Sequence, residues 1–133
     1  MSNPGLKKIL YVDDETLNLD LFQISFESIY SLFVAESPTE GIEIVKQNQD
    51  IDLIISDMHM PEMDGIDFIE KAKEINPNIP CIILSGYQRN EKISEALESG
   101  LINNFLSKPF GQKNLEMIIE KNIIDYRHKT NKD

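Results

Sequence analysis

The sequence predicts an α/β fold in which a five-stranded parallel sheet is covered by helices on both faces. Three observations support this prediction. Short apolar runs rich in β-forming residues alternate five times with segments of helical period. Several of these runs are followed directly by polar side chains, and the 133 residues contain no repeat, linker or low-complexity segment. Such alternation is typical of parallel sheets with right-handed crossovers.

Length and composition restrict the protein class. A chain of 133 residues suits one domain; we expect it over 1–133, with a core at about 7–126 and a frayed polar tail at 127–133. Lys and Arg number 13 against 23 Asp and Glu, a net charge of −10, which disfavours direct nucleic-acid binding. No apolar run reaches membrane-spanning length and residues 1–8 lack a signal sequence, so we expect a cytoplasmic protein without membrane contact.

The first strand is predicted at 7–13 and ends in an acidic group. A helix is predicted over 16–28, because its apolar residues recur at helical spacing. The residues that recur are Leu17, Leu21, Ile24 and, at the end, Ser28 or Ile29. The second strand is predicted at 31–36, where apolar β-formers follow a serine.

The second helix begins with a capping signal at 37–40, where Ser, Pro, Thr and Glu follow one another. Ile42 and Val45 are predicted to form its buried side. The third strand, at 52–57, is apolar until it ends in a carboxylate, which is typical of a strand buried on both faces. A third helix follows and is stopped by Asn76 and Pro77. Its predicted inner face consists of Ile66, Ile69 and Ala72.

The last strands are predicted at 79–85 and 103–107, with helices at 90–100 and 111–126. The single cysteine, Cys81, falls in an apolar run and is predicted to be a small core residue. Gly100 is predicted to end the fourth helix. The inner faces of these helices are predicted at Ile93, Ala96, Leu97, Leu115, Ile119 and Ile123.

Polar groups follow four of the five predicted strands: Asp13 with Asp14, then Asp57, Ser85 and Lys108. Because the strands are parallel, these groups should lie along one edge of the sheet. At ~5 Å and an effective dielectric of ~20, each pair of ionised carboxylates repels by roughly 3 kcal/mol. A divalent cation with oxygen ligands relieves this repulsion, so the edge suits a phosphoryl group bound on Mg²⁺.

Four segments make the chain resemble a response-regulator receiver domain of bacterial two-component signalling. They follow one another in the expected order at the strand ends: 12–15 (VDDE), 57–65 (DMHMPEMDG), 85–86 (SG) and 105–110 (FLSKPF). The resemblance implies the flavodoxin-like strand order 2-1-3-4-5. It also implies a signalling switch that catalyses only its own phosphorylation and dephosphorylation.

The resemblance also implies a role for each residue at this edge. Asp57 would be the phosphoacceptor, and Asp14 and Asp57 would bind Mg²⁺ directly together with the main-chain carbonyl of His59. Asp13 would act on the metal through water. Lys108 would pair with Asp57 and then with the phosphoryl group.

Further implied features concern the readout of phosphorylation. Ser85 would bind the phosphoryl oxygens, Phe105 would be an aromatic switch, and the Lys108–Pro109 peptide bond would be cis. The phosphoryl group would come from a histidine kinase or a histidine phosphotransfer protein. A downstream protein or a fused output domain would read the state, and a homodimer could form through the face made by 90–100, 103–107 and 111–126.

Alternative interpretations remain beside these roles. Asp14 and Asp57 could cap helices, Ser85 could serve only its turn before Gly86, and Phe105 could be ordinary core. The chain could also be a partner-binding module that works without phosphorylation. An aspartyl-phosphate phosphatase is disfavoured, because the segment 12–15 lacks the Asp-x-Asp spacing of such enzymes.

Overall fold

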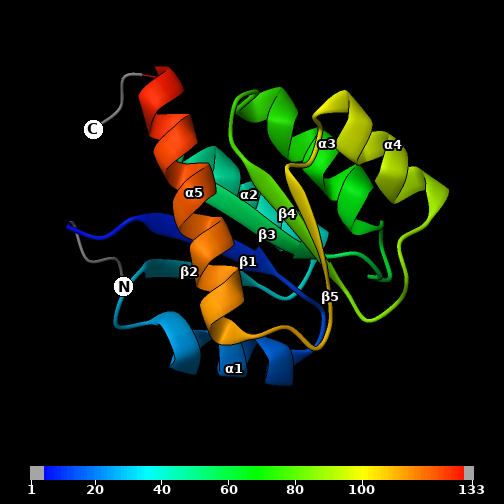
Figure 1. The fold of residues 1–133 in the computed structure, drawn as a ribbon, viewed down its shortest axis with the longest axis horizontal. Coiled ribbons are helices and arrows are strands. Elements are labelled where there is room, and N and C mark those ends of the chain that lie inside the picture. Colours follow the sequence, from blue (N-terminus) through cyan, green and yellow to red (C-terminus); the bar gives the residue numbers. More distant parts are fainter. Residues whose placement is uncertain (1–4, 131–133) are drawn as a thin grey trace.

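The structure, a computed structural model that describes residues 5–130, is a five-stranded parallel sheet flanked by five helices (Figure 1). The strand order β2-β1-β3-β4-β5 confirms the predicted topology. The strands are β1 (Lys8–Val12), β2 (Ser31–Ala35), β3 (Leu53–Asp57), β4 (Cys81–Ser85) and β5 (Asn104–Ser107). The helices are α1 (Thr16–Phe26), α2 (Pro38–Gln47), α3 (Gly65–Ile75), α4 (Glu91–Ser99) and α5 (Gln112–Thr130).

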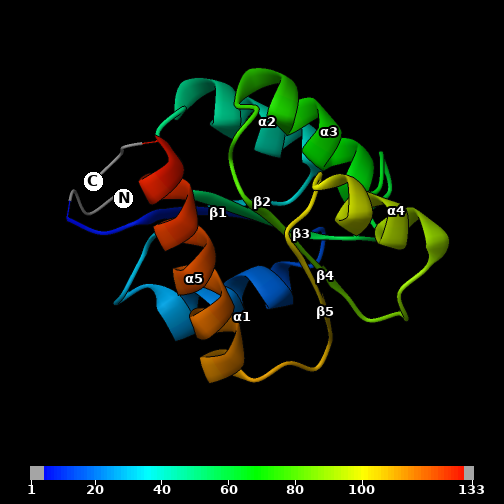
Figure 2. The same cartoon turned by 45° about the horizontal axis from the view of Figure 1, so that its top comes forward.

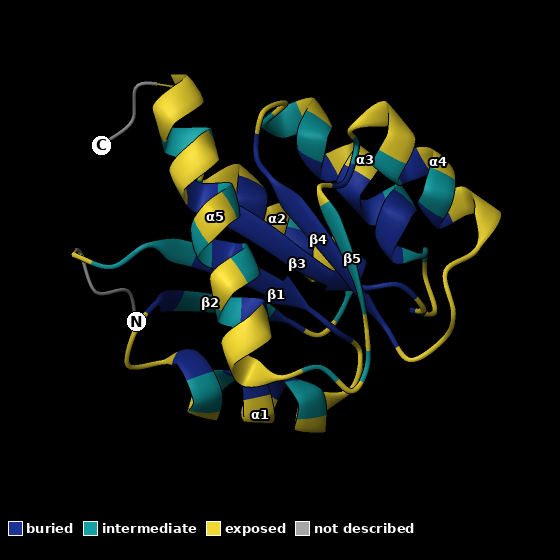
Figure 3. Cartoon of the chain, viewed as in Figure 1, coloured by how far each residue is buried: buried dark blue, intermediate teal, exposed yellow. Residues whose placement is uncertain are grey.

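The molecule has three layers. Helices α1 and α5 cover one face of the sheet, and α2, α3 and α4 cover the other (Figure 2). Each face carries its own hydrophobic core, and the three central strands are almost fully buried (Figure 3). Within the described part of the chain, no helix is both long and apolar enough to cross a lipid bilayer.

The register of the sheet aligns the ends of its strands. Val12 pairs with Ser56, Asp57 with Leu84, and Ser85 with Ser107. All pairs are parallel, so the residues that follow these strands emerge at one edge of the sheet. This edge therefore carries the four polar positions that the sequence singles out.

The start of α2, the end of α4 and the burial of Cys81 agree with the sequence predictions. The Ser37 hydroxyl accepts from the backbone N–H of Glu40, and Pro38 occupies the first helical position of α2. Gly100 ends α4 with a φ of 82°, a left-handed conformation that favours glycine. Cys81 is buried, as predicted, and burial raises the pKa of its thiol to about 12.

Helix α1 is confirmed, but the apolar residues whose spacing predicts it do not form its buried face. Leu17, Leu21 and Ile24 are 67%, 53% and 71% exposed. The helix instead buries a second apolar stripe, formed by Leu19, Phe22 and Phe26. Both stripes fit a helical period, but the second contains two phenyl rings and removes more apolar area from water.

The predicted end of the last helix is wrong. Helix α5 continues through 127–130, which was expected to be frayed, and ends at Thr130. The Arg127 guanidinium binds the Asp52 carboxylate with two hydrogen bonds of 3.1 and 2.9 Å. Asp52 is 1% exposed and also accepts from the backbone N–H of Lys8. A buried carboxylate needs such partners, which explains why the final turns of α5 are held against the sheet. Residues 131–133 lie outside the described part.

Candidate functional site

Three carboxylates meet at the carboxyl edge of the sheet. Asp13 and Asp14 follow β1, whereas Asp57 is the last residue of β3, the neighbouring strand. One oxygen of each lies within 4.8 Å of an oxygen of the other two. Asp13 is fully buried, Asp57 is 8% exposed, and Asp14 faces solvent. The fold thus gathers three negative charges whose repulsion requires compensation.

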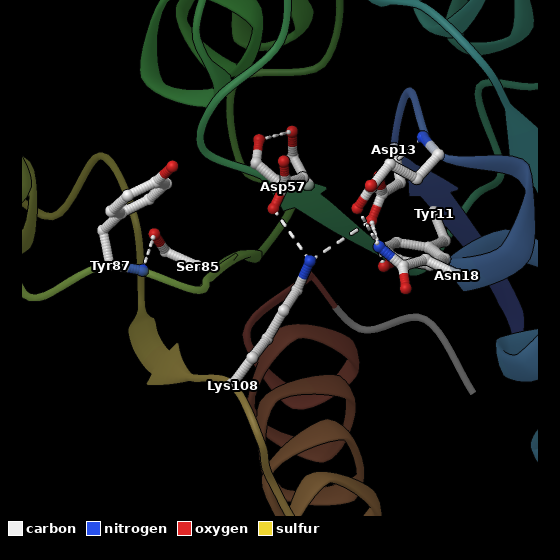
Figure 4. A network of polar contacts seen from close by, with 9 residues as sticks. Tyr11, Asp13, Asn18, Asp57, Ser85, Tyr87 and Lys108 are labelled. Atoms are coloured by element: carbon white, nitrogen blue, oxygen red, sulfur yellow. Dashed lines mark hydrogen bonds and ion pairs between the residues drawn. The ribbon is translucent and has the colours of Figure 1, made fainter.

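Lys108 supplies a positive charge between two of these carboxylates. Its ammonium lies 3.0 Å from Asp57 Oδ1 and 3.4 Å from Asp13 Oδ2 (Figure 4). The side chain reaches the site from the loop after β5, where the Lys108–Pro109 peptide bond is cis. A change in the charge or position of either carboxylate can therefore move the Lys108 ammonium.

The surroundings alter the acidity of this pair. Burial raises the pKa of Asp57 above its ordinary 3.8, the charges of Asp13 and Asp14 add to the rise, and Lys108 opposes it. Burial would lower the pKa of Lys108, but the hydrogen bond to Asp57 and the charge of Asp13 outweigh it and raise the pKa. The lysine accordingly remains a cation.

The loop after β3 holds Asp57 in place by close backbone contacts. Gly65 donates its N–H to the carbonyl of Met58 at 2.8 Å. A Cβ atom on Gly65 would lie 2.4 Å from the carbonyl oxygen of Asp57, so only glycine fits at this approach. The Asp64 carboxylate then caps α3 by accepting from the N–H of Asp67 at 2.8 Å.

A cavity of about 380 Å³ opens beside Asp57 and is also lined by Asp14, Lys108, His59 and Tyr87. The rings of His59 and Tyr87 meet edge to face, with centroids 4.6 Å apart. Both residues are exposed, Tyr87 to 68%. The carboxylate is thus reachable from solvent through an opening that two rings border.

The remaining predicted residues, Ser85 and Phe105, are not among those that line this cavity. Ser85 is fully buried, and its hydroxyl accepts a hydrogen bond from the N–H of Tyr87 at 3.1 Å, a turn contact (Figure 4). Phe105 is half-buried in β5 and packs against the core on the α2–α4 side. The structure therefore brings Asp13, Asp14, Asp57 and Lys108 into one cluster, whereas Ser85 ends the neighbouring strand β4 and Phe105 packs against the hydrophobic core.

Two residues of the site were missed from the sequence. The Tyr11 hydroxyl donates to Asp13 Oδ2 at 2.6 Å, and the Asn18 amide donates to the same oxygen at 3.1 Å. Residues two apart in a strand point to the same face, so the spacing of Tyr11 and Asp13 was a usable signal. Burial raises the pKa of Tyr11, and its bond to Asp13 adds to the rise, so the phenol stays protonated as a donor.

The donor atoms suit a hard divalent cation. Three carboxylates supply oxygen ligands, one of them facing the cavity from an exposed position. Mg²⁺ prefers oxygen ligands and keeps several waters, which the open cavity can admit. The acidic group of Asp13, Asp14 and Asp57 can therefore bind a metal ion.

Comparisons with known proteins agree with this geometry. Residues 9–120 match the response regulator receiver domain family. Sporulation initiation phosphotransferase F of Bacillus subtilis (strain 168) is 32% identical over 116 residues, which cover 86% of this chain and 92% of that protein. A response regulator receiver domain protein from Clostridium thermocellum superposes with a TM-score of 0.86 at 32% identity, covering 92% of this chain and 98% of the other.

A longer relative is transcriptional regulatory protein ZraR of Escherichia coli (strain K12), which is 35% identical over 114 residues. These residues are 85% of this chain, and the chain spans about a quarter of the length of that relative. Because a single family matches most of the sequence and the same fold carries its acidic cluster, this chain belongs to the response regulator receiver domains of two-component signalling.

Proposed function

We propose that this chain is a phosphoacceptor switch in which Asp57 receives a phosphoryl group from a phosphohistidine. The observation that carries the proposal is the position of Asp57: at a strand end, beside an open cavity, 3.0 Å from a lysine ammonium and within 4.8 Å of two further carboxylates. In the transfer, an Asp57 oxygen forms a bond to phosphorus while the bond from phosphorus to the histidine nitrogen breaks. The imidazole leaves with that electron pair.

Each neighbouring group has a proposed part in this reaction. Asp14 and Asp57, with the main-chain carbonyl of His59, would hold Mg²⁺, and Asp13 would bind one of its waters. When bound, the metal would offset the negative charge of the phosphoryl oxygens. Lys108 would stay beside Asp57 and neutralise the oxygens that the transfer brings in. The Ser85 hydroxyl would donate to one of those oxygens after leaving its turn contact.

The direct test is stoichiometric labelling by a small phosphodonor such as acetyl phosphate with Mg²⁺. The wild type should take up one base-labile phosphoryl group, and Asp57→Asn should lose it because the nucleophilic oxygen is replaced. Asp67→Asn, which changes an exposed carboxylate of α3, is the matched control and should be labelled normally. Undiminished labelling of Asp57→Asn would exclude Asp57 as the acceptor.

The same measurements separate the alternative functions. A binding module that works without phosphorylation would show no labelling of the wild type. A phosphatase would turn over a phosphomonoester continuously, whereas a receiver should take up one phosphoryl group and release it only by its own hydrolysis. The chain has both Asp57 and Lys108, and the two side chains are in contact, which supports the receiver function.

The donor protein is proposed to dock on the exposed stripe of α1. Leu17, Leu21 and Ile24 lie four and three residues apart, so they form one apolar face, and all three are exposed. Leu21 also lines a hollow of about 200 Å³ that reaches Lys108 and Phe110. An apolar helix face beside a hollow that reaches Lys108, the lysine in contact with Asp57, suits a helical partner that presents a phosphohistidine.

A comparison of a protein phosphodonor with a small-molecule phosphodonor tests this docking surface. With a phosphotransfer protein that labels the wild type, Leu21→Ser should slow transfer by about tenfold, the effect of losing ~1.4 kcal/mol of contact energy. Labelling by acetyl phosphate should not change, because a small donor needs no docking surface. Met117→Ser, at another exposed apolar residue, on α5, is the control. Equal slowing by both variants would refute docking on α1.

The phosphorylated state is proposed to be read on a different surface. There α4, β5 and α5 form the face that a downstream protein, an output domain or a second copy of the chain would bind. β5 is the edge strand of the sheet, and α5 exposes Met117 and Ile124. These exposed apolar groups and the half-buried Phe105 support this choice.

A further inference from the structure

We propose that Tyr11 is a positioning residue for this site: its hydroxyl holds the Asp13 carboxylate and thereby keeps the Lys108 ammonium on Asp57. The inference rests on the proposed function, since it concerns how the same acidic cluster is kept ready for phosphoryl transfer. Tyr11 itself is 3% exposed and lies behind Asp13, away from the cavity that opens beside Asp57 (Figure 4). It acts on Asp13 and not on the reacting atoms.

Donors are unequally distributed around the Asp13 carboxylate. Oδ2 accepts from Tyr11 at 2.6 Å and from Asn18 at 3.1 Å, and Lys108 approaches the same oxygen only to 3.4 Å. Oδ1 accepts from the N–H of Glu15 at 3.0 Å. A carboxylate oxygen has two lone pairs, so the two shorter donors satisfy Oδ2. Lys108 is consequently left with its closer contact, 3.0 Å, on Asp57.

The phenol is fixed by the fold and cannot follow Asp13 if that carboxylate moves. Tyr11 lies in β1 between Val34 of β2 and Ile55 of β3. Its ring packs on Phe22 of α1, with centroids 4.6 Å apart. The hydroxyl is therefore a fixed donor held by a strand and by a helix.

Removal of the Tyr11 hydroxyl should move the Lys108 ammonium from Asp57 toward Asp13. Asp13 is fully buried and would lose its shortest hydrogen bond, and a buried carboxylate recruits the nearest available donor. That donor is Lys108. Its movement would neutralise part of the charge of Asp13, which is proposed to hold a water of the metal, and that carboxylate would also lose the orientation that Tyr11 gives it. Mg²⁺ should therefore bind more weakly.

The chain contains a matched control for the test. Tyr30 is also 3% exposed, lies in the same core, and donates its hydroxyl to a carboxylate, Glu120 Oε2, at the same distance of 2.6 Å. It precedes β2 and is therefore at the amino edge of the sheet, remote from the site. Tyr11→Phe and Tyr30→Phe each keep a ring and lose one such bond.

Two measurements compare these variants. Mg²⁺ affinity, followed by NMR titration, should fall by about tenfold in Tyr11→Phe, as for other residues that hold a metal ligand. In the metal-free protein, the ¹⁵N signal of the Lys108 ammonium should shift in this variant. Tyr30→Phe should change neither quantity. Asn18→Ala, which removes the second donor, should act in the same direction with a smaller effect.

The third comparison places Tyr11→Phe in a Lys108→Ala background. If Tyr11 acts through Lys108, its substitution should weaken Mg²⁺ binding much less there than in the wild type. An equal loss in both backgrounds, or identical behaviour of Tyr11→Phe and Tyr30→Phe, overturns the proposal. Failure of the wild type to bind Mg²⁺ or to be labelled would instead refute the proposed function. The ammonium signal would still decide whether Tyr11 positions Lys108.

Discussion

His59 and Tyr87 line the same cavity as Asp57, and their rings are in contact. Hydrolysis of an aspartyl phosphate requires water to attack phosphorus from the side opposite the Asp57 oxygen. A phenol and an imidazole beside this path would exclude water, and neither would need to act as a base. We therefore expect the phosphorylated state to decay slowly.

Combined substitution tests this expectation. Tyr87→Gly together with His59→Asn should shorten the half-life of the phosphoprotein, by tenfold for each ~1.4 kcal/mol of barrier that the rings contribute. The measurement is loss of radioactive phosphate with time. Arg89→Ala, an exposed change two residues beyond Tyr87, is the control and should leave the half-life unchanged. An unchanged or longer half-life in the double variant would show that the rings do not shield phosphorus.

At the scale of single elements, β5 connects the site with the proposed output face. Lys108 follows this strand directly, and Phe105 lies within it, half-buried against the core on the α4 side. If Ser85 moves toward a phosphoryl group, the space that it leaves should let Phe105 turn inward. The face formed by α4, β5 and α5 would change with it.

Beryllofluoride, a phosphoryl mimic, provides the test. Its addition with Mg²⁺ should shift the aromatic NMR signals of Phe105 and broaden or move amide signals along α4. Phe33, on the opposite edge strand β2, is the reference ring and should change little. Binding of the mimic without any change at Phe105 would assign that ring to the core alone.

Helix α5 is anchored by an acidic group at its middle. Glu120 accepts from Lys7 at 2.8 Å and from the Tyr30 hydroxyl at 2.6 Å. Burial would raise the pKa of Glu120, but these two hydrogen bonds outweigh it and lower the pKa below 4.5. A lowered pKa in the folded protein means that the ionised form stabilises the fold. This contribution is present above pH 4.5 and is lost as the pH falls through the lowered value.

Glu120→Gln should accordingly destabilise the protein at pH 7, and the difference from the wild type should be smaller at a second pH, chosen below 4.5. Urea unfolding at the two pH values measures the free energy of unfolding in each case. Glu116→Gln, one turn earlier on α5, is the control variant. A difference that stays constant between the two pH values would contradict the ionic anchoring.

For the whole molecule, the acidic cluster is a source of instability in the absence of metal. Asp57→Asn should raise the free energy of unfolding by about 1 kcal/mol, because relief of repulsions of roughly 3 kcal/mol per pair exceeds the loss of pairing with Lys108. Mg²⁺ should stabilise the wild type and reduce this difference. Thermal unfolding with and without Mg²⁺ measures both effects. A destabilised Asp57→Asn would mean that the lysine pairing dominates.

The sequence was sufficient for the architecture and for part of the site. Alternation of strands and helices fixes a parallel sheet, and a charged residue at the end of a buried strand, such as Asp57, indicates a site at the sheet edge. The exposed stripe of α1 was not predictable, because two apolar stripes fit the same period and only tertiary packing selects Phe22 and Phe26. The hydrogen bond of Tyr11 was missed because tyrosine is also an ordinary strand residue.

The ion pair between Arg127 and Asp52 could not be predicted from the sequence, for a different reason. The two residues are 75 positions apart, so no local pattern joins them. The extension of α5 depends on this distant contact, since residues 127–130 are polar and show no apolar period.

That contact also limits how far the protein can be shortened. A version cut after Tyr126, where the apolar period of α5 ends, would leave Asp52 buried at the foot of β3 without its guanidinium. A version cut after Thr130 keeps it. A fragment suited to expression, crystallisation or fusion should therefore extend past Tyr126, where hydropathy alone would end it.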